Sequence, residues 1–216
     1  QSKPATLSEQ MKVLVQPRLV LVYLMTILGY GGTFTAFTYL APILQEEAGF
    51  APSAISLIML VYGVSVAVGN IYGGKLADKK GPIRALTIIF SALAVILFAL
   101  TFTMGSKVAA VITVLVWGAF AFGNVPGLQV YVVQLAEKFT PNAVDVASGL
   151  NIAAFNIGIA VGSILGGAIV DGMQLSDTAW IGAIISVAAL LVTRYSGYLD
   201  KRALSTANTA NSTTSA

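Results

Sequence analysis

The chain has 216 residues and a formal net charge of +3, and only 10% of its residues are charged. A soluble domain carries roughly 25% charged residues, whereas this chain is 56% hydrophobic with a mean hydropathy of +0.84. Most of its surface is therefore expected to lie in lipid. The absence of Cys and His excludes disulfides, Cys/His metal sites and histidine acid–base catalysis, so no metal and no cofactor are expected.

Six apolar segments are long enough to cross about 30 Å of hydrocarbon as helices. They are predicted at 19–45, 50–74, 83–106, 108–136, 146–170 and 178–199. The sixth reaches full length only if the side chain of Arg194 extends to the membrane interface. Stretches such as IIFSALAVILFAL do not alternate apolar and polar residues, so a strand-built barrel is disfavoured. An all-α membrane protein is predicted, because a helix satisfies its own backbone in lipid.

The placement of Lys and Arg predicts the orientation of these spans. Of the 12 basic residues, only Lys107 falls on one side of the membrane, and the others flank the spans on the opposite side. Basic residues accumulate in cytoplasmic loops, so both termini are expected in the cytoplasm. Residues 1–17 are interpreted as the end of a cytoplasmic linker. Residues 201–216, rich in Ser, Thr, Ala and Asn, are predicted to form a disordered cytoplasmic tail.

A charged turn, GGKLADKKGPIRAL at 73–86, separates the second and third predicted spans. Gly81 can adopt a positive φ without steric cost, and Pro82 suits the first turn of the next helix. Asp78 can cap a helix or pair with a cation such as Arg84. A generic cytoplasmic loop would account for the basic residues alone, but the order of residues in this turn is more specific.

That order resembles the loop signature of the major facilitator superfamily, G-x-L-A-D-[RK]-x-G-[RK]-x-x, with Pro82 in place of a basic residue. The resemblance implies one six-helix half of a twelve-helix fold, built from 3+3 inverted repeats. It also implies that the turn gates the transporter and does not contact the substrate. The residues expected to form this gating loop are Gly74, Asp78, Lys79, Gly81 and Arg84.

Longer stretches are similar to the drug/proton antiporter branch, in particular to the arabinose-efflux-like permeases. The stretch that begins FTAFTYLAPILQ resembles the seventh and eighth spans of those antiporters. GNVPGLQVYVVQLA resembles their tenth span, and the stretch that begins ASGLNIAAFNIG resembles their eleventh. The resemblance therefore implies the C-terminal half of a transporter in a bacterial inner membrane. The expected partners are the lipid bilayer, a small-molecule substrate, and either a missing N-terminal half or a second copy of the chain. No nucleic acid is expected.

Small residues recur every four positions in the fifth predicted span and therefore share one helix face: Ala154, Gly158, Gly162 and Gly166. Such a face permits close crossing of two helices. Ordinary helix packing is a sufficient explanation. The same stretch also resembles the antiporter motif G-x-x-x-G-P-x-x-G-G, with Ser163 in place of the proline.

Polar and aromatic side chains in the middle of spans are candidates for lining a substrate cavity. Gly123, Pro126 and Gly127 flank Asn124 and predict a bend in the fourth span. For the aromatic residues the alternative is packing, and for each Asn it is a hydrogen bond between helices. The candidates are Thr26, Tyr30, Phe34, Phe37, Trp117, Asn124, Asn151 and Asn156.

Apart from Arg194 near the end of the sixth, the interiors of the predicted spans contain no Asp, Glu, Lys or Arg, and Arg84 lies at the edge of the third. A proton-coupled transporter needs a titrating group within the membrane, so that group is expected in sequence outside this chain. No nucleophile–base pair is present, and catalysis is not expected. We predict the C-terminal half of a secondary transporter that works by alternating access, with proton-coupled efflux of a small amphiphilic molecule or sugar. A six-helix channel and a non-transporting membrane scaffold are the alternatives.

Overall fold

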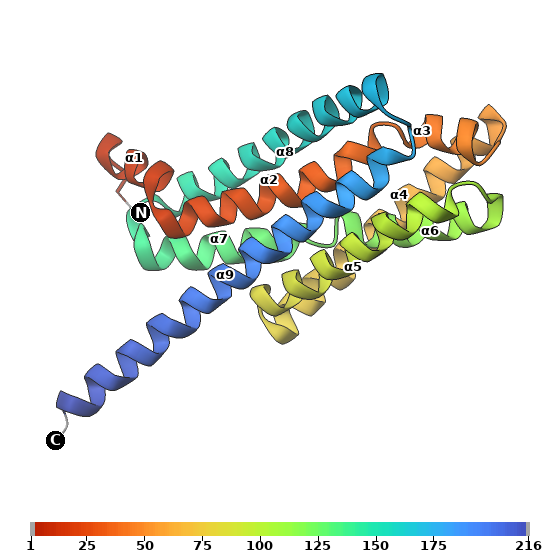
Figure 1. Ribbon diagram of the computed structural model, residues 1–216. Helices are drawn as coiled ribbons and strands as arrows, with labels where there is room; N and C mark the ends of the chain where they lie inside the picture. Colours follow the sequence, from red (N-terminus) through yellow and green to blue (C-terminus); the bar gives the residue numbers. More distant parts are fainter. Residues whose placement is uncertain (1–2, 215–216) are drawn as a thin grey trace.

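The computed structural model describes residues 3–214, and within this range it contains helices and turns but no strand (Figure 1). Six segments in the described range are long and apolar enough to cross a membrane, with α6 and α7 forming one broken span. In chain order the elements are α1 (Leu7–Val15), α2 (Pro17–Phe37), α3 (Leu40–Pro42), a π-helical turn η1 (Ile43–Glu47), α4 (Pro52–Lys80), α5 (Pro82–Thr103), α6 (Lys107–Ala121), α7 (Val125–Phe139), a 3-10 turn η2 (Pro141–Ala143), α8 (Val144–Gly172) and α9 (Asp177–Thr214).

Local sequence signals explain where several helices begin. Thr6 caps α1 through a reciprocal capping box with Glu9, and the Thr6 backbone N–H holds the pKa of the Glu9 carboxyl below its usual value. Helices α2, α4 and α5 each carry proline in the first turn, where its missing N–H is not needed. Gly81 joins α4 to α5 with a φ of +81°, a conformation that favours glycine.

Helix α2 lies in the middle of the bundle, with α8 on one side and α9 on the other (Figure 1). Helix α5 packs on α9, and α4 packs on α6. Numbering the six spans in order, the first contacts the fifth, the second contacts the fourth, and the third contacts the sixth. If the first three spans are exchanged with the last three, the contact of the first with the fifth becomes that of the fourth with the second, and the contact of the third with the sixth is unchanged. An inverted 3+3 repeat requires this symmetry.

Glycines allow two of these crossings to bring backbones together. On α8, a Cβ built at Gly158, Gly162 or Gly166 would lie 2.8, 2.6 or 2.5 Å from a backbone carbonyl oxygen of α2. On α4, a Cβ at Gly69 or Gly73 would lie 1.8 or 2.0 Å from the backbone oxygen of Ala119 or Gly123. Both crossings therefore exclude any side chain larger than hydrogen.

The fourth span is broken between α6 and α7. Pro126 has no N–H to donate to the carbonyl four residues earlier, which belongs to Phe122. The Phe122 carbonyl instead accepts from the Val125 N–H at 3.3 Å and from the Asn70 side chain at 3.5 Å. The expected bend is thus a short helical interruption that ends one helix at Ala121 and starts the next at Val125.

Two segments differ from the sequence-based expectation. The first predicted span ran to residue 45, but α2 ends at Phe37, and α3 and η1 follow, with η1 ending at Glu47. Pro42 cannot donate an α-helical hydrogen bond, which is consistent with an irregular segment there. The prediction of a disordered tail was wrong for residues 201–214, because α9 continues to Thr214. This stretch contains neither Gly nor Pro, and Thr206 and Thr209 donate to carbonyls of the preceding turn. Residues 215–216 of that prediction lie outside the described range.

Candidate functional site

Aromatic side chains from four spans meet where the fourth span is broken. Tyr30, Phe34 and Phe37 follow one another along α2, with ring centroids 5.8 and 5.2 Å apart. Phe122, at the break, lies 5.6 to 6.4 Å from all three rings. The cluster, here called the aromatic wall, consists of Tyr30, Phe34, Phe37, Tyr62, Trp117, Phe122 and Phe155.

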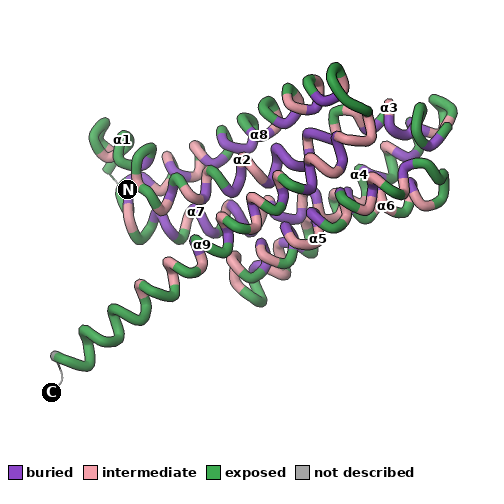
Figure 2. The backbone as a smooth tube through the Cα atoms, viewed as in Figure 1, coloured by how far each residue is buried: buried purple, intermediate pink, exposed green. Residues whose placement is uncertain are grey.

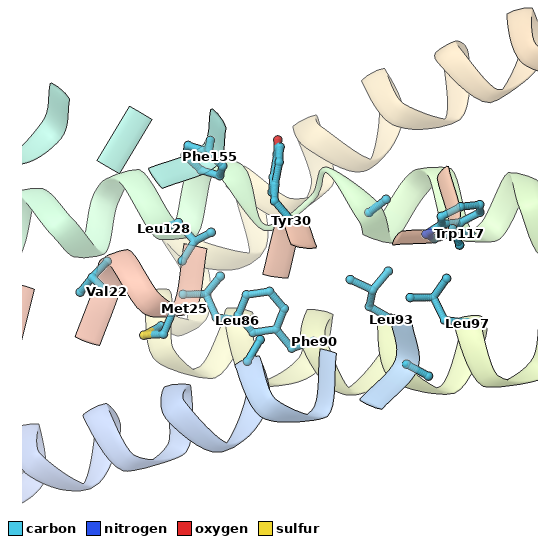
Figure 3. Packing of buried hydrophobic residues seen from close by; sticks show 14 of the residues in the cluster. Val22, Met25, Tyr30, Leu86, Phe90, Leu93, Leu97, Trp117, Leu128 and Phe155 are labelled. Carbon is cyan, nitrogen blue, oxygen red and sulfur yellow. The ribbon is translucent and has the colours of Figure 1, made fainter. Parts of the chain in front are cut away.

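The members of the aromatic wall differ in depth. Phe34, Phe37 and Phe122 are half-buried and provide its accessible part, whereas Trp117 is fully buried behind Phe37. In Figure 3, Tyr30 points away from the row of buried side chains formed by Leu86, Phe90, Leu93 and Leu97. The wall therefore lies on the opposite side of α2 from the aliphatic core between α5 and α9.

Asn124 lies at the helix break, two residues after Phe122 of the aromatic wall. Its side chain is completely buried, and within the described residues neither its amide nitrogen nor its amide oxygen has a hydrogen-bond partner. The amide nitrogen lies 3.4 Å from the position that a Cβ would occupy at Gly29 of α2. Because an unpaired buried amide is costly, Asn124 has hydrogen-bonding capacity that the bundle leaves unused.

The other polar candidates are bonded within the bundle. Thr26 donates to the Asn151 side chain at 2.7 Å, and Asn151 donates to Gln129 at 2.6 Å. Gln129 in turn donates to Ser148 at 3.3 Å, so the chain of bonds links α2, α7 and α8. Asn156 is exposed on α8 and donates to the Ile152 carbonyl of its own helix. The structure therefore brings Thr26 and Asn151 together and leaves Asn156 apart.

The predicted gating residues lie at the α4–α5 turn. Gly74 faces Pro126 of α7, and Gly81 forms the turn itself. Asp78 and Arg84 are both exposed, and among residues 3–214 neither forms an ion pair. The expected pairing between them is therefore absent from this structure. Helix α4 continues through Asp78 to Lys80, and the Asp78 carboxylate is exposed to solvent.

Sequence reasoning missed a polar network that joins the start of α2 to α7 and α9. Arg18 forms an ion pair with Asp200, and the Tyr131 hydroxyl donates to the same carboxylate at 2.9 Å. Ser196 bonds the Tyr131 hydroxyl at 2.6 Å, and the Arg18 guanidinium lies over the Phe139 ring at 5.7 Å. Sequence spacing gave no signal for this network because its members are up to 182 positions apart. Phe122 and Phe155 of the aromatic wall were missed for the same reason.

The family model of the Major Facilitator Superfamily matches residues 1–144. The six spans, their crossings and this match establish the class of protein. The chain belongs to the major facilitator superfamily of transporters.

Two similar relatives are transport proteins of bacteria. The chain is 52% identical over 197 residues to the uncharacterized MFS-type transporter YtbD of Bacillus subtilis, covering 91% of this chain and 50% of that protein. It is 35% identical over 187 residues to the inner membrane transport protein YdhP of Escherichia coli K12, covering 85% and 46%. The chain thus spans about half the length of the curated relatives it matches.

Among solved structures, the chain resembles a variant of the E. coli fucose:proton symporter FucP. The TM-score is 0.74 at 15% identity, and the match covers 88% of this chain and 46% of the symporter. A second structure of FucP, in the outward conformation, gives a TM-score of 0.72 at 14% identity. At this identity the likeness shows the fold, which is half of a major-facilitator fold.

Proposed function

We propose that this chain forms the C-terminal six-helix half of a secondary transporter that works by alternating access. We further propose that the complete protein couples efflux of a small amphiphilic molecule or sugar to proton movement across a bacterial inner membrane, with both termini in the cytoplasm. The observation that carries this proposal is the aromatic wall at the helix break, where the unpaired amide of Asn124 follows Phe122 by two residues.

The wall suits a substrate with both apolar and polar groups. Aromatic rings offer large, rigid contact surfaces to the apolar part of a ligand or to a sugar ring. An unpaired buried amide favours a ligand that can hydrogen-bond, because the bond removes the cost of leaving the amide unsatisfied. The fucose:proton symporter with the same fold is a precedent for proton coupling and for a sugar substrate.

The second half of the transporter is proposed to cover the exposed apolar faces beside the wall. On α4, Leu57, Leu60 and Val64 are each at least 60% exposed, and Ile164 on α8 is 74% exposed. A second six-helix unit or a second copy of the chain would bury part of this surface. The coupling acid is assigned to that unit, because within the predicted spans this chain carries no carboxylate.

The α4–α5 turn is proposed to gate the transporter. With no ion pair to Arg84 in this structure, Asp78 is free to pair with a cation of the second half in the alternative access state. This pairing would stabilise one access state over the other by a differential contact.

Flux through the complete, purified protein in proteoliposomes tests the proposal. With an imposed pH gradient, transport of ethidium, arabinose and fucose is measured for the wild type, for F37A and for F102A. Phe37 belongs to the wall, whereas Phe102 is 73% exposed on α5 and serves as the matched control. At least one probe is expected to move with the pH gradient, and F37A is expected to lower its rate about tenfold through loss of ring contacts worth roughly 1.4 kcal/mol.

Other outcomes contradict the proposal in distinct ways. A flux that depends on the concentration gradient of the probe but not on the pH gradient indicates a channel. No flux of any probe above empty liposomes indicates a scaffold. Equal loss in F37A and F102A would show that the aromatic wall has no special role.

A further inference from the structure

A cavity lies at the end of the bundle that carries the α4–α5 turn. It has a volume of about 920 Å³ and lies between this turn, the end of α7 and α9. Four basic side chains line it, namely Lys80, Arg84, Arg194 and Lys201. They come from two stretches of the chain, 80–84 and 194–201, which lie far apart in the sequence.

The positive charge of this cavity is not neutralised within the described part of the chain. Among residues 3–214, none of the four basic side chains forms an ion pair. The only acid in the lining is Asp200, whose carboxylate is bound by Arg18 and by the Tyr131 hydroxyl. Helix α5 starts in the same cavity with no acidic residue in its first turn, so its positive dipole end adds to the field. The cavity therefore favours an anion.

Apolar stripes run from the cavity along the outside of the bundle. On α5, Ile88, Val95 and Phe102 follow Arg84 at intervals of 4, 7 and 7 residues, which keeps them on one helix face, and all three are exposed. On α9, Leu191, Val187 and Ile184 precede Arg194 at helical spacing and are also exposed. Helices α5 and α9 pack against each other, so the cavity opens next to a surface suited to acyl chains.

Tyrosines mark the level of the membrane interface beside the cavity. Tyr195 and Tyr198 on α9 are 54% and 56% exposed, and tyrosine is enriched where hydrocarbon meets headgroups. Arg194 precedes them directly. In Figure 2 the part of α9 beyond this level is exposed and leaves the bundle. The four cations thus lie at headgroup depth, with the apolar stripes below them.

We propose that this cavity binds the headgroup of an anionic phospholipid, with the acyl chains lying along the α5 and α9 stripes. The phosphate contacts Lys80, Arg84, Arg194 and Lys201. A basic pocket between transmembrane helices is a physical match for such a headgroup. A free phosphate shares the headgroup chemistry but leaves the apolar stripes unused, so the two ligands differ in measurable affinity.

Binding of short-chain lipids to the complete protein in detergent tests this site. Native mass spectrometry and thermal unfolding are followed with dioctanoyl phosphatidylglycerol, dioctanoyl phosphatidylcholine and inorganic phosphate. The cavity variant combines K80Q, R84Q, R194Q and K201Q. The charge-matched control combines K12Q, K75Q, K138Q and R202Q, which remove four cations from the same end of the bundle outside the cavity.

The wild type is expected to bind phosphatidylglycerol at least about tenfold more tightly than phosphatidylcholine. Each cation near a headgroup is worth roughly fivefold in affinity, so the cavity variant is expected to lose phosphatidylglycerol binding more than tenfold. The control variant should change it less than about threefold, because its cations contribute only screened, distant attraction.

Three results would overturn the proposal. The cavity variant could bind phosphatidylglycerol like the wild type, or the control could lose as much affinity as the cavity variant, which would indicate diffuse surface charge. Inorganic phosphate could also bind as tightly as phosphatidylglycerol, which would make the site one for a soluble anion. If the fourfold cavity variant does not fold, R194Q and K201Q alone replace it, each with an expected loss of about fivefold.

Discussion

Buried polar side chains in this bundle differ in how completely they are bonded. Thr26, Asn151 and Gln129 form a continuous chain of hydrogen bonds between three helices. The side-chain amide of Asn124, in contrast, has no partner within the described residues. The first group contributes to the association of helices, because hydrogen bonds between spans hold them in register. The unpaired amide of Asn124 forms no such bond and is costly to bury, which is why it is the stronger candidate for a ligand contact.

Replacing Thr26 by Val tests the bonded chain. The substitution keeps the side-chain shape but removes the hydroxyl that donates to Asn151, so thermal unfolding in detergent should show a loss of about 1 kcal/mol. T193V is the matched control, because Thr193 is also fully buried but its hydroxyl donates only to Ala189 of its own helix. An equal effect of both variants would show that the bond between helices has no special weight.

At the level of elements, the close crossings depend on which face of each helix carries glycine. Gly162 and Gly149 both belong to α8, but only Gly162 faces the α2 backbone. A stripe of glycines on one face predicted close packing without predicting the neighbour. The identity of that neighbour, α2, and the equivalent crossing of α4 on α6 came from the tertiary structure.

Two alanine variants separate packing from helix propensity in α8. In G162A the new Cβ would lie 2.6 Å from the Gly31 carbonyl oxygen, and moving α2 away should cost about 1–3 kcal/mol in unfolding free energy. In G149A the Cβ meets no atom within 4 Å, and the gain in helix propensity should stabilise the protein by up to about 1 kcal/mol. Thermal unfolding of both variants in the same detergent measures the difference. A neutral G162A would contradict the close crossing.

On the scale of the whole molecule, the distribution of charge relative to the six spans determines orientation. Lys107 is the first residue of α6, at the end of the bundle opposite to the α4–α5 turn. The other basic residues lie before or within α1, at the starts of α2 and α5, near the ends of α4 and α7, and at positions 194–202 of α9. They include Arg18 and the four cations that line the cavity at the α4–α5 turn. An even number of spans brings both ends of the described chain to this basic side.

Labelling of single introduced cysteines tests the orientation. The 216 residues contain no cysteine, so K79C, S205C and G105C each add one thiol to them. An impermeant maleimide added to intact cells should label G105C, and it should label K79C and S205C only after permeabilisation. Labelling of K79C and S205C from opposite sides would contradict the six-span topology. Labelling after detergent treatment is the control for thiol reactivity.

The amino-acid sequence by itself determined the solvent, the class and the family of this protein. Low charge and long apolar segments without alternation required a helical membrane protein. In lipid, each such segment must pair its own backbone N–H and C=O groups, and a helix does so. The G-x-L-A-D-[RK] pattern is local, so it identified the family before any packing was known. Proline and glycine around Asn124 likewise predicted the interruption of the fourth span, since their effects on the backbone act within a few residues.

Only the tertiary structure decided which distant side chains meet. The Arg18–Asp200 ion pair, the place of Phe122 and Phe155 in the aromatic wall, and the four cations around one cavity each join residues from different spans. Composition and periodicity describe one helix at a time, and the rotation of each helix about its axis is set by packing against its neighbours. The helical continuation of α9 to Thr214 was also missed, because polar composition alone does not exclude helix where Gly and Pro are absent.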